Sequence, residues 1–166
     1  MRDLVAAGFD PGTARLGFGV IAGDDDKPVP LDYGVIETSA TDSMPERLKQ
    51  LYDGVVEVLQ TYRPSVCAVE KLFFARNVTT ALVVGQARGI VMLAAAQASV
   101  KVVEYTPAEV KQAVSGYGKA DKSQMQEMVR LILGLREAPW PDDAADALAV
   151  ALCHVQSARF REAIGE

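Results

Sequence analysis

The stretch LVAAGFDPGTARLGFGVIA, residues 4–22, decides the fold class of this chain of 166 residues. It contains two short apolar runs, residues 4–9 and 16–22, with the turn sequence DPGT between them at residues 10–13. Short apolar runs that are bounded by turn residues predict β-strands. A third run over residues 31–38 follows a loop, so this part of the chain predicts an antiparallel meander.

Beyond the meander, helical and strand patterns alternate. Ser43 and Glu46 have the spacing of a capping box, and apolar residues then repeat with a helical period until Pro64. Later helices are predicted over residues 79–97, 107–114, 122–134 and 142–159, and strands over residues 65–69 and 100–104. Since no segment has the composition of a linker, residues 1–166 are expected to form one domain. The order βββαβαβααα predicts a three-layer α/β domain with a five-stranded mixed sheet, in which two parallel strands follow three antiparallel ones.

Composition excludes several classes of protein. The two cysteines lack the spacing of a disulfide framework, which fits a reducing cytosol. The start of the chain carries Asp3 and has no long apolar region, so a secretory signal is not expected. The longest apolar stretch, residues 78–100, is interrupted by Gln86 and Arg88, which a membrane span rarely tolerates. We therefore expect a cytoplasmic protein without a membrane partner.

The charges are unevenly distributed along the chain. The formal net charge is −5, which by itself argues against nucleic acid as a ligand. Residues 71–130, however, carry eight basic and four acidic residues, whereas the remainder carries nine basic and 18 acidic residues. Such asymmetry can place a polyanion-binding face on an acidic protein. A random partition of surface charge is the alternative explanation.

Four acidic residues stand where strands end or where a helix begins. Asp10 lies at the carboxyl end of the first predicted strand, and Glu70 lies at that of the fourth. Asp143 and Asp146 are three residues apart at the start of a helix and so share one face. If the first and fourth strands are neighbours, the four carboxylates can converge beyond the sheet edge. Clustered oxygen ligands suit Mg²⁺ or Mn²⁺, and two such ions can promote phosphodiester hydrolysis.

Some of these acids also have a plain structural explanation. Asp10 could simply begin a turn, and Asp142 is expected to be the N-cap of the last helix. Asp146 is harder to explain in this way, because alanines surround it and a charge there is unfavourable unless it is paired or metal-bound. Glu70 ends a buried strand, which is also unusual on packing grounds.

Four motifs resemble those of the bacterial RuvC Holliday-junction resolvases. They are GFDPGT at residues 8–13, VEKLFFARN at residues 69–77, GQARG at residues 85–89 and DAADALA at residues 143–149. The resemblance runs in collinear order from about residue 4 to residue 154. It implies an RNase H-like fold, a homodimer, and the cutting of four-way DNA junctions by paired symmetric nicks with Mg²⁺.

The resemblance also implies roles for individual residues. The catalytic, metal-binding carboxylates would be Asp10, Glu70, Asp143 and Asp146, with two Mg²⁺ ions per active site and Mn²⁺ able to substitute. Some relatives have His at the position of Asp143, and Asp142 is its rival in the alignment; the Asp-Ala-Ala-Asp spacing favours Asp143. The expected DNA-binding residues are Phe73, Phe74, Lys71, Arg76, Lys111, Lys119 and Lys122.

The physical support for these DNA contacts is unequal. Phe73 and Phe74 lie between Lys71 and Arg76, a combination suited to stacking on a splayed base. Because successive residues of an extended segment face opposite ways, one of the two rings is expected to pack inward. The three lysines 111, 119 and 122 flank a glycine-containing connection, from which cations can reach phosphates. For any single lysine, a solvated surface position remains the alternative.

Two further residues receive no role in the chemistry. Trp140 stands between two prolines and is expected to be a packing residue. His154 is the sole histidine, so no Ser-His-Asp arrangement can be argued, and it is given no catalytic role.

The acidic residues favour a metal-dependent nuclease, and the resemblance implies a structure-selective endodeoxyribonuclease that resolves Holliday junctions in homologous recombination and DNA repair. By resemblance its partners are four-way junction DNA, a second copy of the chain and the RuvA–RuvB branch-migration complex. The helix over residues 79–97 is expected either to contact the second copy or to pack on its own sheet. Two alternatives stay open: a related RNase H-like nuclease that acts on RNA or other branched DNA, and a noncatalytic junction-binding protein.

Overall fold

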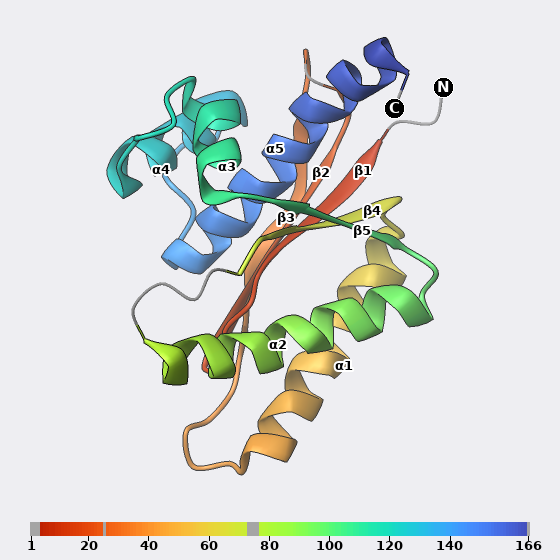
Figure 1. Ribbon diagram of the computed structural model, residues 1–166, viewed down its shortest axis with the longest axis vertical. Helices are drawn as coiled ribbons and strands as arrows, with labels where there is room; N and C mark the ends of the chain where they lie inside the picture. The colour runs from red at the N-terminus through yellow and green to blue at the C-terminus, as the bar shows by residue number, and fades with distance from the viewer. Residues whose placement is uncertain (1–3, 25, 73–76, 166) are drawn as a thin grey trace.

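The computed structural model describes residues 4–24, 26–72 and 77–165, which build a sheet of five strands in the order β3-β2-β1-β4-β5 (Figure 1). The strands are β1 (Val5–Asp10), β2 (Arg15–Ala22), β3 (Val29–Glu37), β4 (Val66–Glu70) and β5 (Lys101–Tyr105). β1, β2 and β3 pair in antiparallel fashion, whereas β4 and β5 are added in parallel beside β1. The predicted meander and its two parallel additions are confirmed.

Helices cover both faces of this sheet. They are α1 (Met44–Tyr62), α2 (Val78–Gln97), α3 (Pro107–Ser115), α4 (Lys122–Ile132) and α5 (Asp142–Ile164). α1 and α2 lie on one face, and α5 lies on the other together with α3 and α4 (Figure 1). The core divides in the same way, because neighbouring residues of a strand point to opposite faces. Ala6 and Ala68 pack toward α5, whereas Ala7 and Cys67 pack toward α1 and α2. The three-layer α/β/α architecture is therefore confirmed.

The first turns of α5 lie directly on the backbone of β1 and β2. A Cβ atom at Gly17 would be 2.1 Å from the carbonyl oxygen of Asp143, and a Cβ atom at Gly8 would be 2.1 Å from that of Ala147. These distances are far inside van der Waals contact, so only glycine permits the approach. The two glycines thus fix the height of α5 above the sheet, and with it the position of the acids in its first turns.

α2 is apolar and only partly covered by the rest of the chain. Among the described residues it is the one helix that is long and apolar enough to cross a membrane, with a mean hydropathy of 1.5 and 28% of its most apolar window buried. It packs on α1 and β5, and its Arg88 forms an ion pair with Glu104 of β5. Val78, Leu82 and Leu93 remain exposed on it. α2 is thus a layer of this fold that also carries an uncovered apolar face.

The exposure of Trp140 differs from what the sequence predicted. It lies in the segment between α4 and α5, and 80% of it is exposed to solvent. The neighbouring Pro139 is buried instead. The expectation that Trp140 is a packing residue is therefore wrong: the proline anchors this segment, and the indole is turned outward.

His154 lies in the core, on the buried side of α5. Its Nδ1 is 2.7 Å from the hydroxyl oxygen of Tyr105. Burial lowers the pKa of His154 to about 4, and the positive charges of Arg161 and Lys101 act in the same direction. His154 is therefore neutral and hydrogen-bonded near pH 7, which is the behaviour of a structural residue.

Candidate active site

Acidic side chains from three elements meet at one edge of the sheet. Asp10 ends β1 and Glu70 ends β4, and these two strands are parallel neighbours. The carboxyl ends of neighbouring parallel strands open onto the same edge. α5 begins over β2 at this edge, so Asp143 and Asp146 in its first turns act on the Asp10 carboxyl group. The predicted convergence of the four acids is present in the structure.

The pKa of Asp10 reflects its burial and the acids around it. Burial, followed by the negative charges of Asp146, Asp143 and Glu70, raises the pKa of Asp10 to about 8. Burial also raises the pKa of Glu70 and that of Asp146. Acids that repel one another in a partly dry site are unfavourable for folding, and groups perturbed in this way cluster at functional sites. The edge of the sheet is therefore a strong candidate for the active site.

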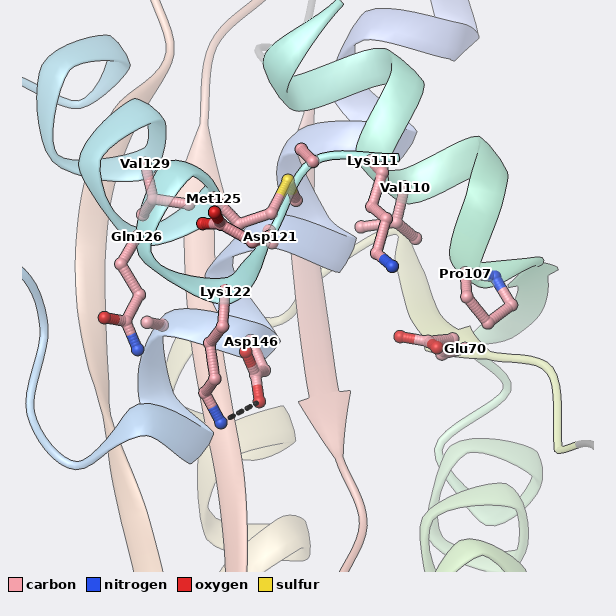
Figure 2. A pocket seen from close by; sticks show the side chains of 13 residues that line it. Glu70, Pro107, Val110, Lys111, Asp121, Lys122, Met125, Gln126, Val129 and Asp146 are labelled. Carbon is pink, nitrogen blue, oxygen red and sulfur yellow. Dashed lines mark ion pairs between the residues drawn. The ribbon is translucent and has the colours of Figure 1, made fainter. Parts of the chain in front are cut away.

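A cavity of about 260 Å³ opens beside the acids (Figure 2). Glu70 and Asp146 line it together with Lys111 of α3 and Lys122 of α4. The charge of Lys111 lowers the pKa of Glu70, and the charge of Lys122 lowers the pKa of Asp146, in each case against the larger effect of burial. The cavity thus offers two carboxylates and two cations to whatever enters it, a combination suited to a phosphodiester group.

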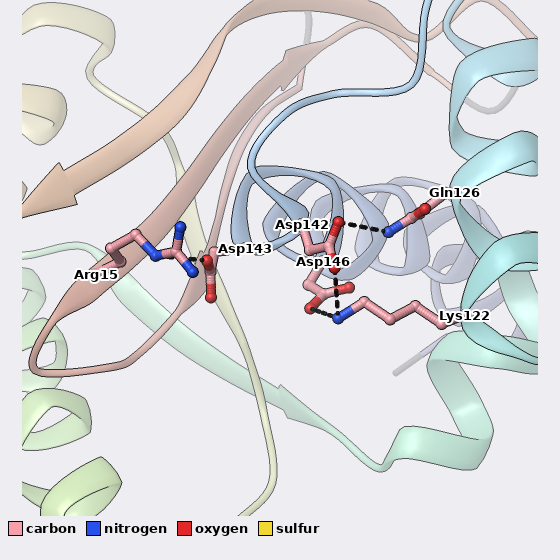
Figure 3. A network of polar contacts seen from close by, with 6 residues as sticks. All are labelled: Arg15, Lys122, Gln126, Asp142, Asp143 and Asp146. Carbon is pink, nitrogen blue, oxygen red and sulfur yellow. Dashed lines mark hydrogen bonds and ion pairs between the residues drawn. The ribbon is translucent and has the colours of Figure 1, made fainter.

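Lys122 joins α4 to the first turn of α5 (Figure 3). Its Nζ lies 3.1 Å from Oδ2 of Asp142 and 3.8 Å from Oδ2 of Asp146. Gln126, one turn further along α4, donates a hydrogen bond of 3.0 Å from Nε2 to Oδ1 of Asp142. Asp142 is therefore held by two side chains of α4, and Lys122 is shared between Asp142 and the acidic cluster.

Asp142 is not the N-cap of α5, so that prediction is wrong. The N-cap is Pro141, which makes no side-chain hydrogen bond to the helix, and Asp142 is the first helical residue. Its carboxylate turns to α4, where a charged amine is a stronger partner than a backbone N–H group. Asp143 points to β2 instead, where Nε of Arg15 lies 3.3 Å from its Oδ2 (Figure 3). Of these two neighbouring acids, Asp143 is the one whose charge raises the pKa of Asp10.

Arg15 and Gln126 belong to this network, although nothing in the sequence singled them out. Arg15 begins β2, two residues before Gly17, on which Asp143 packs. This proximity follows only from the way in which α5 crosses β2. Gln126 reaches Asp142 only because α4 packs beside α5. Both contacts are tertiary, so the local sequence pattern carries no signal for them.

Of the other predicted DNA-binding residues, the structure describes Lys71 and Lys119. Lys71, directly after β4, and Lys119, between α3 and α4, are exposed, and neither lines the cavity. Phe73, Phe74 and Arg76 lie outside the described residues. Of the predicted cations, the structure therefore brings Lys111 and Lys122 to the acids and leaves Lys71 and Lys119 on the surface.

The chemistry of the donor set fits a hard divalent cation. The acids offer only oxygen ligands, which Mg²⁺ and Mn²⁺ prefer, and a bound cation would relieve the repulsion that raises the pKa of Asp10. In residues 4–24, 26–72 and 77–165, no three acidic, histidine or cysteine side chains are already arranged to hold a metal ion. Instead, Asp143 forms an ion pair with Arg15, and Asp146 forms an ion pair with Lys122.

Comparisons with known proteins agree with this geometry. The sequence model of the family described as crossover junction endodeoxyribonuclease RuvC matches residues 6–154. The RuvC protein of Rubrobacter xylanophilus is 54% identical over 161 residues, which cover 97% of this chain and 90% of that protein. The RuvC protein of Chloroflexus aggregans is 54% identical over 160 residues, which cover 96% of this chain and 98% of that protein.

A solved structure extends the similarity to three dimensions. The structure of Thermus thermophilus RuvC in complex with a Holliday junction substrate superimposes with a TM-score of 0.90 and 46% sequence identity, covering 95% of this chain and 96% of that chain. The expected RNase H-like architecture is therefore confirmed. By sequence and by fold, this chain belongs to the RuvC family of crossover junction endodeoxyribonucleases.

Proposed function

We propose that the acidic cluster of this chain hydrolyses phosphodiester bonds at the centre of four-way DNA junctions, as the resolving step of homologous recombination and DNA repair. The observation that carries the proposal is the convergence of Asp10, Glu70, Asp143 and Asp146 at one sheet edge, beside a cavity that Lys111 and Lys122 share. A noncatalytic junction binder would gain nothing from acids that face phosphates, which disfavours that alternative.

The family to which this chain belongs consists of metal-dependent nucleases. We propose Mg²⁺ as the metal, two ions per active site, with Mn²⁺ able to substitute and with Asp10, Glu70, Asp143 and Asp146 as ligands. When bound, the metal supplies an activated water and stabilises the negative charge of the leaving oxygen. Burial of the carboxylates keeps competing water away from them and strengthens their hold on a cation.

Lys111 and Lys122 would bind the phosphates that flank the cut. Both ammonium groups line the cavity, and Lys122 is already engaged by Asp142 and Asp146. Without DNA, the ammonium group of Lys122 pairs with Asp142, and the flexible lysine side chain can turn from there to bind a phosphate. Lys71 and Lys119 would contact DNA further from the cut. Phe73, Phe74 and Arg76, which lie outside the described residues, stay proposed DNA contacts, with one of the two rings at an unpaired base near the crossover.

We infer that two copies of this domain, residues 1–166, work together. Two symmetric nicks need two active sites related by a two-fold axis, which a homodimer supplies. Val78, Leu82 and Leu93 on α2 form an apolar face that a second copy would cover. A cytoplasmic location fits an enzyme that acts on chromosomal DNA, and the RuvA–RuvB complex is the proposed partner that delivers the junction.

A nicking assay on matched substrates tests the proposal. The substrates are an end-labelled mobile four-way junction, a linear duplex and an RNA–DNA hybrid, each with Mg²⁺ and with a chelator. We expect paired symmetric nicks in the junction alone, only with metal, and none from Asp146→Asn. Asp53→Asn removes an exposed acid of α1 and serves as the matched control, with unchanged nicking. Cleavage of the hybrid alone would assign the site to RNA, and tight junction binding without cleavage would contradict an enzyme.

A further inference from the structure

Trp140 is the most exposed large hydrophobic side chain among the described residues. Its exposure of 80% exceeds that of Phe160 at 67% and of Val78 at 65%. An indole is the largest apolar group that a protein can bury, so leaving it in water forgoes a substantial hydrophobic gain. Tryptophan is also enriched among the residues that carry most of the binding energy at protein interfaces, and aromatic side chains stack on the bases of single-stranded nucleic acid. We therefore expect a binding partner to cover the Trp140 side chain.

The backbone on both sides of Trp140 is restricted. Pro139 is buried on one side, and Pro141 is the N-cap of α5 on the other, where its carbonyl oxygen accepts a hydrogen bond of 2.9 Å from the Ala144 N–H group. Proline fixes its own backbone φ angle and restricts the residue before it. A tryptophan side chain has only two rotatable bonds, so binding immobilises little. Trp140 is thus presented in advance, at low entropic cost.

Trp140 lies two positions before Asp142, the first residue of α5, whose first turns carry Asp143 and Asp146. Only Pro141 separates Trp140 from Asp142 in the sequence, so their Cα atoms are at most about 8 Å apart. Asp142 shares Lys122 with Asp146. Because a DNA strand rises about 3.4 Å per nucleotide, a Cα separation of about 8 Å corresponds to between two and three nucleotides along a strand whose phosphate is at the acids.

We infer that Trp140 is a further DNA contact, whose indole stacks on a base within about three nucleotides of the cut. This inference rests on the proposed function. Stacking uses the face of the base, so it tolerates any sequence, and Lys122, which forms an ion pair with Asp142, would hold the backbone of the same strand. α2, the proposed dimer element, lies on the opposite face of the sheet from α5, the helix that Trp140 precedes (Figure 1).

Intrinsic fluorescence reports on this contact directly, because Trp140 is the sole tryptophan of the chain. Wild-type protein is titrated with a four-way junction without divalent cations, so that no cleavage occurs, and nicking with Mg²⁺ is measured in parallel. We expect the fluorescence to be quenched as the junction binds. A 2-aminopurine placed one to three nucleotides from the cut should change its emission in the complex, whereas one placed ten nucleotides away should not.

Three variants distinguish stacking from a structural effect. Trp140→Ala is expected to raise the Kd for the junction about 5- to 100-fold, and Trp140→Phe is expected to stay within about threefold of wild type. Phe160→Ala removes another exposed aromatic ring, near the far end of α5, and should leave binding unchanged. All three should melt within a few degrees of wild type, because the side chains that they change are exposed.

The outcomes separate this inference from the proposed function. If wild type binds and nicks the junction while its fluorescence stays constant and Trp140→Ala binds equally well, the inference is wrong and the proposed function stands. If the fluorescence changes with protein concentration in the absence of DNA, the indole contacts protein and the inference is again overturned. If wild type neither binds nor nicks junctions, the proposed function fails and this inference fails with it.

Discussion

The polar side chains in the first turns of α5 and those in its second half differ in their charge. In its first turns, Asp143 and Asp146 face Asp10, and burial and mutual repulsion raise the pKa of Asp10 to about 8. In its middle, His154 is hydrogen-bonded to Tyr105, and burial lowers its pKa to about 4, so it carries no charge near pH 7. The second half of α5 thus buries an uncharged side chain, whereas the first half brings acidic side chains together. That difference separates a site kept for chemistry from one kept for stability.

The largest expected effect comes from neutralising an acid in the first half. Asp10→Asn should lower the rate of junction nicking by about 100-fold or more, because an amide is a poor ligand for a divalent cation. It should leave the metal-free protein at least as stable as wild type, because it removes a repelled charge. Single-turnover nicking and thermal melting check the two parts. A marked fall in melting temperature would mean that Asp10 stabilises the fold instead.

The second half should show the opposite behaviour as the pH changes. The pKa of His154 falls from 6.5 in the unfolded chain to about 4 in the folded one, so the folded protein binds fewer protons between these values. Its contribution is complete above pH 6.5 and is lost as the pH falls to 4, by about 3 kcal/mol. Urea unfolding of wild type and of His154→Gln at pH 7 and pH 4.5 measures it. Equal pH dependence of the two proteins would contradict the assignment.

A smaller effect is expected where α5 rests on β2. Gly17→Ala places a Cβ atom where the carbonyl oxygen of Asp143 lies, so the helix must shift, and we expect a loss of about 1–3 kcal/mol together with slower nicking. Gly89→Ala is the matched control, since nothing lies within 4 Å of a Cβ atom there and the helix α2 should gain stability. Denaturant unfolding measures both. If Gly17→Ala is as stable as wild type, the packing of α5 on β2 does not require glycine at this position.

The smallest effect is expected at the lysine that links α4 to the acids. Lys122→Met should weaken junction binding about tenfold and reduce the slope of log K against log salt by about one, because one phosphate contact is lost. Lys49→Met removes a lysine that pairs with Asp53 on α1 and should change neither value. Binding is measured at several salt concentrations. An unchanged slope for Lys122→Met would remove Lys122 from the proposed phosphate contacts.

The order of strands and helices along the chain could be predicted from the sequence, because it follows from local pattern. That β1 and β4 are neighbours, on which the convergence of the four acids depends, was only a condition of that prediction. Turn residues end the apolar runs, and an acid directly after a buried strand must lie at the sheet edge, as Asp10 and Glu70 do. The packing of one element on another could not be predicted. The pairing of Arg15 with Asp143, the turn of Asp142 toward α4, and the outward position of Trp140 all depend on how helices dock on the sheet.

The central claim is that the four carboxylates act as one metal-dependent site. Single-turnover nicking of a four-way junction by Glu70→Gln, by Asp146→Asn and by the double variant tests it most directly. Because residues that act as a unit are not additive, each single variant should lose about 100-fold or more, and the double variant should be no slower than the worse single one. Losses that multiply in the double variant, or near-normal nicking by either single variant, would contradict a shared site.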